Sequence, residues 1–375
     1  MNLTGEILAL LSLTIWLYLF FFHGWFWRSQ PELSPAMPSA APVVDIIVPA
    51  RNEAVTIQAV IASLLAQDYP GTFSVTLVDD DSSDGTAHAA GAARNLSVIS
   101  GRPKPSGWSG KLWALRQGIE ETSAPVLLFT DGDVVHDSRH LSALVARLLN
   151  PACNMVSEMV RLSCTSAPER LLVPAYVYFF QLLYPFGRVN DPRSSVAAAA
   201  GGTVLVRRNA LEKAGGIDAI KSALIDDVAL AKIIKASGPI YLGHSGLATS
   251  LRAYSSVSDI WEMITRTAFT QLRHSAALLL LTVVGLSLVF LSPLWAALFA
   301  HGWSRAAGVA SYALLTIGYM PTLRRYRQSR ALALALPLIA LFYMGATIAS
   351  AINYWSGRGT VWKNRDYDAN SCAGP

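Results

Sequence analysis

Charged residues are scarce in this sequence, and their scarcity indicates its class. Only 15% of the 375 residues are Asp, Glu, Lys or Arg, and the mean hydropathy is +0.37, whereas about 25% of an average soluble domain is charged. The net charge of +5 is modest, and the polar part of the chain holds no dense stripe of Lys and Arg. These features predict a protein of the lipid bilayer and argue against nucleic acid as a partner.

Cysteines and several well-known motifs are also rare or missing. The three cysteines, Cys153, Cys164 and Cys372, are odd in number and scattered, which argues against a disulfide scaffold and favours a reducing compartment. No G-x-G-x-x-G follows a strand pattern and no Walker A sequence occurs, so neither a dinucleotide site nor a P-loop is indicated. The absence of G-x-S-x-G leaves no sign of a serine nucleophile.

Long uncharged runs are present near both ends of the chain. Residues 7–27 carry no charged residue, and about 20 apolar residues suffice to cross a bilayer. A cleaved signal peptide is the alternative, but no Lys or Arg precedes this run. Further spans are expected near 276–300, 306–321 and 331–353. Arginines beside these runs predict that the polar middle of the chain is cytoplasmic; they are Arg28, Arg324, Arg325, Arg327 and Arg330.

The middle of the chain alternates between strand and helix patterns. Apolar runs predict buried strands at 43–50, 73–80, 96–100 and 125–133, with helical patterns between them. One of these helices is expected to open within 81–93. The alternation predicts an α/β fold with a doubly wound nucleotide-binding sheet. The expected domains are a transmembrane anchor at 1–28, a proline-rich linker at 29–42, the sheet domain at 43–275, transmembrane helices at 276–353 and a basic tail at 354–375.

Acidic residues gather where these strands end. Three pairs lie at strand ends or at a helix start: Asp79 and Asp80, Asp131 and Asp133, and Asp226 and Asp227. Ligands of open α/β sheets bind at the carboxyl ends of the strands, and Mg²⁺ or Mn²⁺ takes one or two carboxylates plus phosphate oxygens. Any one pair alone could be an ordinary turn or a solvated face. Together the three pairs predict a ligand site with a divalent cation.

The stretch 168–188 is apolar and about long enough to cross a bilayer. It lies between the acids at 131–133 and those at 226–227, and a single crossing there would separate them across the membrane. We therefore expect either a helix at the membrane surface or a helix buried beneath the sheet. In both cases the helix is expected to be broken near Pro174 and Pro185.

Several segments carry a family resemblance. In chain order they are VDIIVPARNE, LVDDDSSDGT, GKLWALRQG, FTDGDV, AAAGGTVLVRR, IDDVALA and QLRH, and they cover about residues 43–275. They resemble the family-2 glycosyltransferases with the GT-A fold, and among these the hopene-associated glycosyltransferases of bacterial hopanoid gene clusters. The resemblance implies a GT-A-type doubly wound nucleotide-binding domain that is flanked by transmembrane α-helices, one of them N-terminal and about three C-terminal.

The resemblance also implies an activity and a place in the cell. Such enzymes transfer a sugar from a nucleotide-sugar donor, here expected to be a UDP-sugar, with inversion at the anomeric carbon. The expected acceptor is a membrane lipid hydroxyl in hopanoid biosynthesis; the alternatives are a polyprenyl phosphate and another glycolipid precursor such as a diacylglycerol. The enzyme would be a multi-pass protein of the bacterial inner (cytoplasmic) membrane, with its catalytic domain in the cytoplasm.

Residue roles follow from the matching motifs. Asp227 matches the second acid of the family's Glu-Asp pair and is the expected general base, with Asp226 as a shorter first acid. The expected nucleotide-sugar-binding residues are Pro49, Arg51, Glu53, Asp79, Asp80, Lys111, Asp131 and Arg273. The expected metal ligands for Mg²⁺ or Mn²⁺ are Asp131 and Asp133, and the expected acceptor-binding residues are Gly201, Gly202 and Thr203. Two alternatives remain: Lys111 could be a solvated lysine at a helix start, and Arg273 a juxtamembrane arginine.

The sequence departs from the family at one motif and leaves two rival functions open. The Q-x-x-R-W motif is reduced to QLRH, which supplies Gln271, Arg273 and His274 but no Trp, and this weakens any expectation of polymer synthesis. The rivals are a transporter or channel with a nucleotide-binding regulatory domain, and a nucleotide-binding regulator without turnover. The predicted spans hold few of the ionisable residues that transport pathways need, and every acid needed for transfer is present.

Overall fold

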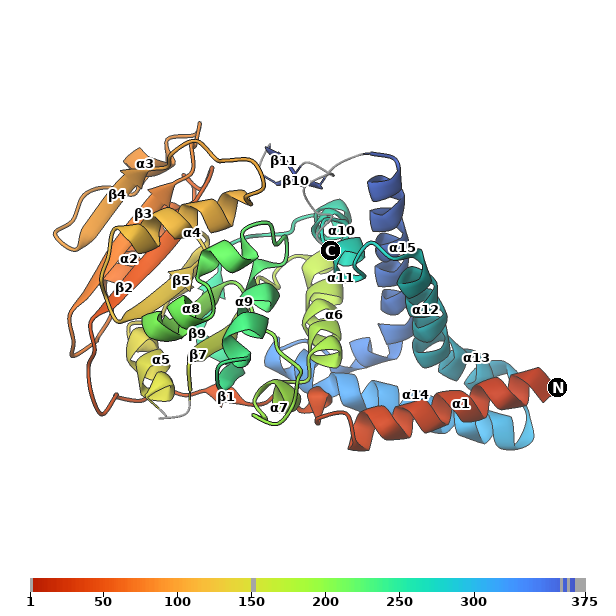
Figure 1. Cartoon of the computed structure of the whole chain (residues 1–375). Coiled ribbons are helices and arrows are strands. Elements are labelled where there is room, and N and C mark those ends of the chain that lie inside the picture. Colours follow the sequence, from red (N-terminus) through yellow and green to blue (C-terminus); the bar gives the residue numbers. More distant parts are fainter. Residues whose placement is uncertain (1–2, 150–152, 358–359, 363–364, 368–375) are drawn as a thin grey trace. The chain divides into compact units, whose positions relative to one another are not determined.

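The computed structural model describes residues 3–149, 153–357, 360–362 and 365–367. The chain forms two compact units, and neither is continuous in sequence (Figure 1). Unit 1 consists of Met1–Gln30, Cys164–Gly187 and Ala253–Thr360, and unit 2 consists of Pro31–Ser163, Arg188–Arg252 and Val361–Pro375. Most of the expected basic tail, with Cys372, lies outside the described residues; within it, β10 (Thr360–Trp362) pairs with β11 (Arg365–Tyr367).

Among the described residues, unit 2 is built on a nine-stranded sheet with the order β1-β9-β7-β8-β5-β2-β3-β4, in which β6 pairs with β9. Strands β5, β2, β3 and β4 are parallel to one another, and so are β1, β9 and β7. Strand β8 lies between these two groups and pairs antiparallel with β5 and β7, and β6 pairs antiparallel with β9. The sheet is therefore mixed α/β and Rossmann-like. The strands are β1 (Glu32–Leu33), β2 (Val44–Ala50), β3 (Phe73–Asp79), β4 (Leu96–Ser100), β5 (Val126–Thr130), β6 (Val134–His136), β7 (Met155–Arg161), β8 (Thr203–Arg207) and β9 (Ile240–Ser250).

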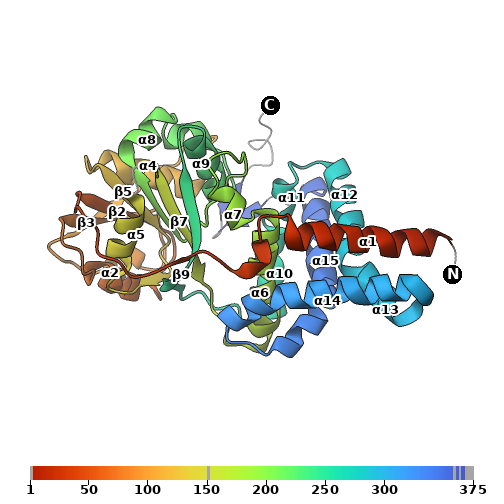
Figure 2. The same cartoon turned by 90° about the horizontal axis from the view of Figure 1, so that it is seen from below.

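Helices cover both faces of this sheet (Figures 1 and 2). Every residue of β2 is buried, and its side chains alternate between the two faces. Ile46 belongs to the apolar cluster that includes α2 (Ile57–Leu65) and α5 (His140–Leu148). Ile47 faces the other way, against Gly118 of α4, where an added Cβ would lie 2.5 Å from the Ile47 side chain. The helical elements on the α4 side are α4 (Gly110–Glu120), α8 (Arg208–Lys213), η2 (Ile217–Ile220) and α9 (Asp226–Lys235).

The helix expected within 81–93 is much shorter than its pattern suggests. Only α3 (Thr86–Ala89) forms, because Gly85 and Gly91 on either side have φ of 85° and 73°, which a right-handed helix cannot accommodate. The Asp84 carboxylate accepts a hydrogen bond from the Thr86 backbone N–H at 3.0 Å and starts this single turn. A helix does open within 81–93, as expected, but it is limited to a single turn.

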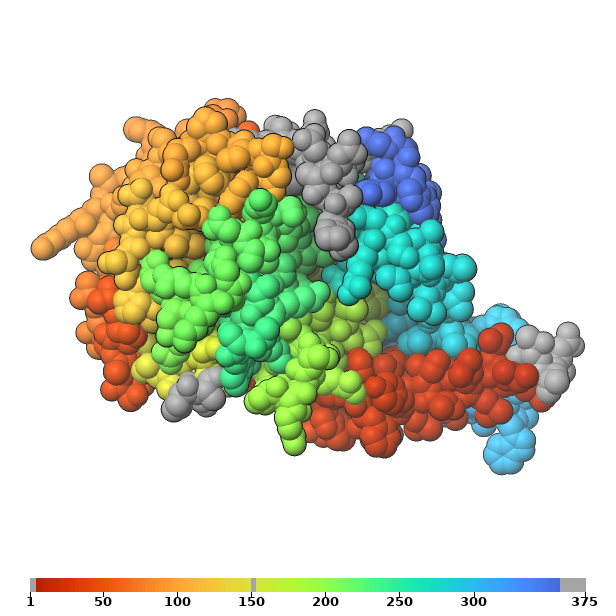
Figure 3. Space-filling model, viewed as in Figure 1, coloured from red at the N-terminus to blue at the C-terminus, as the bar shows by residue number. Residues whose placement is uncertain are grey.

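Unit 1 is helical. Its elements are α1 (Leu3–Phe21), η1 (Phe26–Arg28), α6 (Ala167–Leu183), α10 (Val257–Thr265), α11 (Ala268–Gln271), α12 (Ala276–Leu286), η3 (Ser287–Leu291, a π-helical turn), α13 (Ser292–Phe299), α14 (Gly302–Arg325), η4 (Arg330–Ala335) and α15 (Leu336–Trp355); the short α7 (Phe186–Val189) lies where the chain passes to unit 2. Both views show α1 lying beside α14. Figure 3 shows α1 in red at the surface of unit 1, and the sequence of this helix is mostly apolar.

Within the part of unit 1 that the structure describes, three continuous helical segments are long and apolar enough to cross a membrane: Ala276–Phe299, Gly302–Arg325 and Arg330–Trp355. They confirm the three C-terminal apolar helices, although the middle one is longer than the expected 306–321. The N-terminal apolar helix ends at Phe21, so the expected span to residue 27 was too long. Gly24 and Trp25 adopt φ of 62° and 54°, and this left-handed backbone ends any continuous helix before η1.

Most of the apolar stretch 168–188 lies in α6, which packs against α10, α14 and α15 of unit 1. The helix belongs to the helical unit, so the expected position beneath the sheet was wrong. The helix continues through Pro174, so the break expected there was wrong, whereas Tyr184 and Pro185 do end it. Its start is fixed by a capping box between Ser166 and Glu169. The Tyr343 hydroxyl of α15 donates a hydrogen bond to the Leu172 carbonyl at 2.9 Å.

Candidate active site

One edge of the sheet in unit 2 collects the predicted acids. Strands β2, β3 and β5 are parallel, so their carboxyl ends lie together, with Asp79 at the end of β3 and Asp131 directly after β5. Strand β8 runs the other way and begins at this edge, because Thr203 pairs with Thr130, the last residue of β5. The antiparallel strand therefore brings Gly201 to the same edge as the acids.

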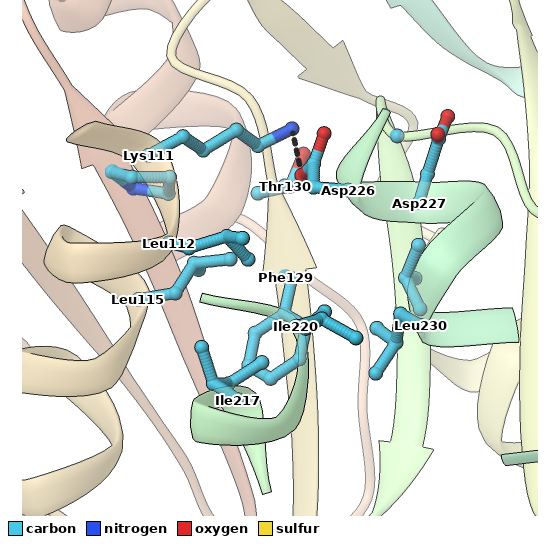
Figure 4. Close-up of a pocket in the computed structure, with 13 residues that line it drawn as sticks. Lys111, Leu112, Leu115, Phe129, Thr130, Ile217, Ile220, Asp226, Asp227 and Leu230 are labelled. Atoms are coloured by element: carbon cyan, nitrogen blue, oxygen red, sulfur yellow. Dashed lines mark ion pairs between the residues drawn. The ribbon is translucent and has the colours of Figure 1, made fainter. Parts of the chain in front are cut away.

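Lys111 joins two of the acidic pairs. Its Nζ atom lies 2.8 Å from Oδ1 of Asp131 and 3.2 Å from Oδ2 of Asp226, and Figure 4 shows it reaching from α4 toward Asp226. The start of α4 is held by Ser109, whose hydroxyl accepts a hydrogen bond from the Leu112 backbone N–H at 3.3 Å. Burial alone would lower the pKa of Lys111, but the two carboxylates outweigh it and the pKa is raised. Lys111 thus stays a cation, and the alternative of a solvated lysine was wrong.

Asp227 lies beside this cluster, and its pKa is shifted toward neutral pH. Burial raises the pKa of Asp227 to about 7; the neighbouring Asp226 carboxylate adds to the rise, and the Lys111 cation offsets only part of it. One carboxylate oxygen accepts a hydrogen bond from the Val228 backbone N–H at 2.7 Å. A carboxylate with this pKa can accept and release a proton near neutral pH, which is the property a general base needs.

A small pocket lies beneath these charged groups, and Figure 4 shows apolar side chains below them. A Cβ at Gly201 would lie 3.3 Å from both Oδ2 of Asp227 and Nζ of Lys111, so a side chain there would crowd both. The apolar residues exclude water from below Asp227, which is the physical source of its raised pKa. The lining residues are Pro49, Lys111, Leu112, Leu115, Phe129, Thr130, Gly201, Val204, Ile217, Ile220, Asp226, Asp227 and Leu230.

Asp133 points into a second cluster, which includes Arg252, a residue that the sequence did not single out. The Nε atom of Arg252 lies 3.5 Å from Oδ2 of Asp133, and its Nη2 lies 3.8 Å from Oε1 of Glu53. The Ser250 hydroxyl is also 3.4 Å from Oδ2 of Asp133. An arginine two residues after a strand carries no distinguishing sequence pattern. Arg252 comes near Asp133 only because β9 pairs with β6 in the folded sheet.

Arg51 holds two loops of this edge together. Its guanidinium donates hydrogen bonds to the backbone carbonyls of Asp80 and Asp81. The same loops are tied by a hydrogen bond from the backbone N–H of Glu53 to the Thr86 hydroxyl at 2.8 Å. Asp79 keeps one buried carboxylate oxygen, Oδ1, without a hydrogen-bond partner among the described residues.

The remaining predicted residues lie apart from the pocket lining. A Cβ at Gly202 would lie 2.9 Å from the Val160 side chain, so Gly202 is a close packing contact within the sheet. Thr203 is fully buried, and its hydroxyl donates to the Gly202 carbonyl at 2.8 Å. Arg273 belongs to unit 1, in the turn after α11, with φ of 52°. Its role stays a prediction.

Comparisons with known proteins agree with this fold. Residues 45–215 match the model of glycosyl transferase family 2. A beta-monoglucosyldiacylglycerol synthase of Trichormus variabilis is 24% identical over 331 residues, which cover 81% of this chain and 69% of that protein. Glycosyltransferase AglE of Haloferax volcanii is 31% identical over 125 residues, 32% of this chain and 40% of that protein. The mannosyltransferase PcManGT of Pyrobaculum calidifontis, solved in complex with GDP-Man and Mn²⁺, shares the fold with a TM-score of 0.55 and 20% identity, over 93% of this chain and 98% of that one.

The sheet, the acidic edge and these likenesses define a glycosyltransferase of the hexosyltransferase type with a GT-A fold. Its segment 45–215 matches the model of glycosyl transferase family 2, and membrane-length apolar helices follow it in the chain. The relatives above bear the names of a diacylglycerol glycolipid synthase and of general glycosyltransferases, and the narrower likeness to hopene-associated enzymes gains no support from them.

Proposed function

We propose that this protein transfers a sugar from a nucleotide-sugar donor to the hydroxyl group of a membrane lipid, with Asp227 as general base. The observation that carries the proposal is the arrangement around Lys111. One cation lies between Asp131 and Asp226, beside a carboxylate whose pKa is about 7. A cation for the diphosphate and a base for the hydroxyl proton are the two groups that such a transfer needs.

The proposed reaction is a single displacement. The acceptor oxygen forms a bond to the anomeric carbon while the bond from that carbon to the diphosphate oxygen breaks, and its electron pair leaves with the diphosphate. The hydroxyl proton passes to the Asp227 carboxylate. Attack from the side opposite the leaving group inverts the anomeric configuration. Lys111 attracts the diphosphate and, through its ion pairs, holds Asp131 and the first turn of α9 in register.

The residues at this edge fit a divalent cation that is bound together with the donor. Among the described residues, no three His, Cys, Asp or Glu side chains are grouped to hold a metal alone. Mg²⁺ and Mn²⁺ commonly take one or two carboxylates plus phosphate oxygens, and Asp131 is a partly exposed carboxylate with Asp133 in the same turn. When bound, the cation neutralises charge on the departing diphosphate. The Mn²⁺ named with the Pyrobaculum calidifontis structure supports this assignment.

The proposed acceptor is a neutral lipid alcohol. Unit 1 supplies three helices of membrane length, and basic residues flank them, so the enzyme is proposed to be an integral membrane protein with unit 2 in the cytoplasm. A relative named for β-monoglucosyldiacylglycerol synthesis favours a diacylglycerol. The hopanoid that the resemblance implied has no such support and becomes one arm of the test.

The test is a transfer assay with the purified full-length protein in detergent. Labelled UDP-glucose, UDP-galactose and GDP-mannose are offered with dioleoylglycerol, a hopanoid alcohol or a polyprenyl phosphate in separate reactions, each with Mn²⁺ or with a chelator. We expect labelled lipid with an alcohol acceptor, and only in the presence of the metal. Label in none of the reactions would contradict the proposal, and transfer that survives chelation would contradict the metal assignment.

A further inference from the structure

A chain of buried polar side chains runs from the active-site edge into the interior of unit 2. The Thr130 hydroxyl lies 3.0 Å from Nε2 of His136, and Nδ1 of His136 lies 2.7 Å from Nδ1 of His140. The other ring nitrogen of His140 contacts Oε1 of Glu158. At most 7% of the surface of any of the four residues is exposed. They come from β5, β6, α5 and β7, so only the tertiary structure assembles them.

Such a chain is a costly way to fill a protein interior. Buried polar groups contribute little net stability, and apolar residues of similar volume would serve as well or better. The chain lies next to apolar residues, since Leu141 and Val145 of α5, the helix that carries His140, belong to the main core cluster. Glu158 even keeps one buried carboxylate oxygen, Oε2, without a hydrogen-bond partner among the described residues. A role other than stability is therefore the better account of the chain.

Counting protons gives the chain a direction. The Thr130 hydroxyl donates its single proton to the Gly202 carbonyl at 2.9 Å, so Nε2 of His136 must be the donor in its contact with Thr130. Burial and the nearby His140 lower the pKa of His136 well below its usual value, so this ring is neutral and its Nδ1 must accept from His140. One proton shared between His140 and Glu158 then satisfies the last contact. From His140 to Thr130, every donor therefore points toward Gly202.

The acceptor at the end of the chain occupies a sensitive position. Thr130 directly precedes Asp131, and the pair Thr130–Thr203 is the last in the ladder between β5 and β8. The bond from Thr130 to the Gly202 carbonyl adds one connection beyond that last pair. Gly202 follows Gly201, whose backbone lies against Asp227 and Lys111.

We infer that Thr130, His136, His140 and Glu158 form a positioning chain that sets the spacing between Asp131, directly after β5, and Asp227, which lies opposite Gly201. The chain ends on a backbone carbonyl, so it delivers no proton to a substrate and acts by geometry alone. The inference rests on the proposed function, because the two acids are placed for sugar transfer. A displacement of about 1 Å between reacting groups can cost about 100-fold in rate, so losing the chain should impair turnover more than donor binding.

The test compares two threonines of the same sheet. Thr130→Val keeps the shape of the side chain but removes the hydroxyl, and we expect kcat to fall about 10- to 100-fold with less than about a threefold change in KM for the nucleotide sugar. Thr130→Ser restores the hydroxyl and should recover most of kcat. The matched control is Thr76→Val on β3, which removes a hydroxyl that is also buried, 3.1 Å from Oδ2 of Asp45, and should leave kcat unchanged.

A double variant asks whether the residues act as one unit. If the chain is continuous, Thr130→Val combined with His136→Phe should lose no more kcat than the more impaired single variant, whereas independent structural damage would multiply. Wild-type kcat in Thr130→Val, equal loss in Thr76→Val, or no recovery in Thr130→Ser would each overturn the inference.

Hydrogen exchange separates this inference from the transfer proposal. Peptides covering 126–134 and 197–206 should exchange faster in Thr130→Val than in the wild type, and no faster in Thr76→Val. This readout needs no activity. If the wild-type protein transfers no sugar, the transfer proposal falls, while unchanged exchange in Thr130→Val would still overturn the positioning chain.

Discussion

Lys111 and Asp227 line the same pocket, but their neighbours shift their protonation in different ways. Two carboxylates within 3.2 Å hold Lys111 in its charged form, whereas apolar residues and the Asp226 carboxylate hold Asp227 close to its titration point. Burial alone would lower the pKa of Lys111, whereas it raises the pKa of Asp227 into the range that a general base needs. Two experiments examine this pair directly: a substitution that removes the proton acceptor, and a change of pH.

Replacing the proposed base, Asp227, is the first residue-scale prediction. Asp227→Asn keeps the size of the side chain but removes the proton acceptor, so kcat with a lipid alcohol should fall by about 10²–10⁴-fold, with donor affinity nearly unchanged. Single-turnover transfer and donor titration measure the two effects. A phosphate acceptor is already ionised and needs little help from a base, so substantial retained transfer to a polyprenyl phosphate would contradict the lipid-alcohol assignment.

The pH profile is the second residue-scale prediction. The proposed base acts only as the carboxylate, and the pKa of Asp227 is raised to about 7. Below that value most of the enzyme carries the protonated acid, so kcat/KM should rise about tenfold per pH unit until about pH 7 and then level off. Lys111 stays charged throughout this range, so its titration adds no second slope to the pH–rate profile. A profile that is flat between pH 5 and 8 would contradict the role of Asp227.

At the scale of single elements, helix starts do much of the positioning. Ser109 caps α4 and so places Lys111, while the start of α9 places Asp226 and Asp227. The start of α6 is held by several hydrogen bonds to one carboxylate. Glu169 is fully buried and accepts hydrogen bonds from the backbone N–H groups of Thr165 and Ser166, both at 2.8 Å, and of Tyr254 at 2.7 Å.

Glu169 provides the element-scale prediction. Glu169→Ala leaves three backbone donors of unit 1 without their carboxylate, and hydrogen bonds to charged groups are worth about 1.5–3 kcal/mol each. We expect the free energy of unfolding to fall by at least about 3 kcal/mol, seen as a lower Tm in detergent. Glu121→Ala at the exposed end of α4 is the matched control and should leave Tm unchanged. Equal Tm values for the two variants would contradict this account of α6.

At the scale of the whole molecule, each compact unit is assembled from segments that are separate in the sequence. The chain leaves unit 1 after Gln30, returns to it at Cys164 for α6, and returns again at Ala253. Unit 2 is nevertheless one compact body, and its sheet takes strands from both sides of α6: β7 precedes this helix, and β8 and β9 follow it. Positions on either side of α6 must therefore face the same compartment.

Labelling of single cysteines tests this topology. In a chain whose three native cysteines are replaced by serine, Ala92→Cys and Arg193→Cys introduce exposed thiols in unit 2 on either side of α6. An impermeant maleimide should label both only after the cytoplasmic face is opened. His301→Cys, between two membrane-length helices, should be labelled from the outside. Labelling of positions 92 and 193 from opposite faces would contradict a single cytoplasmic unit 2.

The local sequence determined much of the first half of the sheet. Strands β2, β3, β4 and β5 begin and end within a few residues of the predicted 43–50, 73–80, 96–100 and 125–133. Strands β2 and β5 are buried at every residue, and apolar runs are typical of strands that are covered on both faces. The acids after these strands could likewise be placed at one edge, since parallel strands end together. Two glycines with positive φ stopped the helix at 81–93, which its apolar pattern could not foretell.

Only the tertiary structure decided which side chains meet. The antiparallel entry of β8 brings Gly201 to the acids, Lys111 forms ion pairs with residues 20 and 115 positions away, and Arg252 reaches Asp133 from the end of β9. The buried chain from Thr130 to Glu158 depends on four separate elements. Such contacts cannot be predicted from the spacing of apolar residues. That spacing indicates which side of a helix or strand is buried, but not which distant residue it contacts in the folded chain.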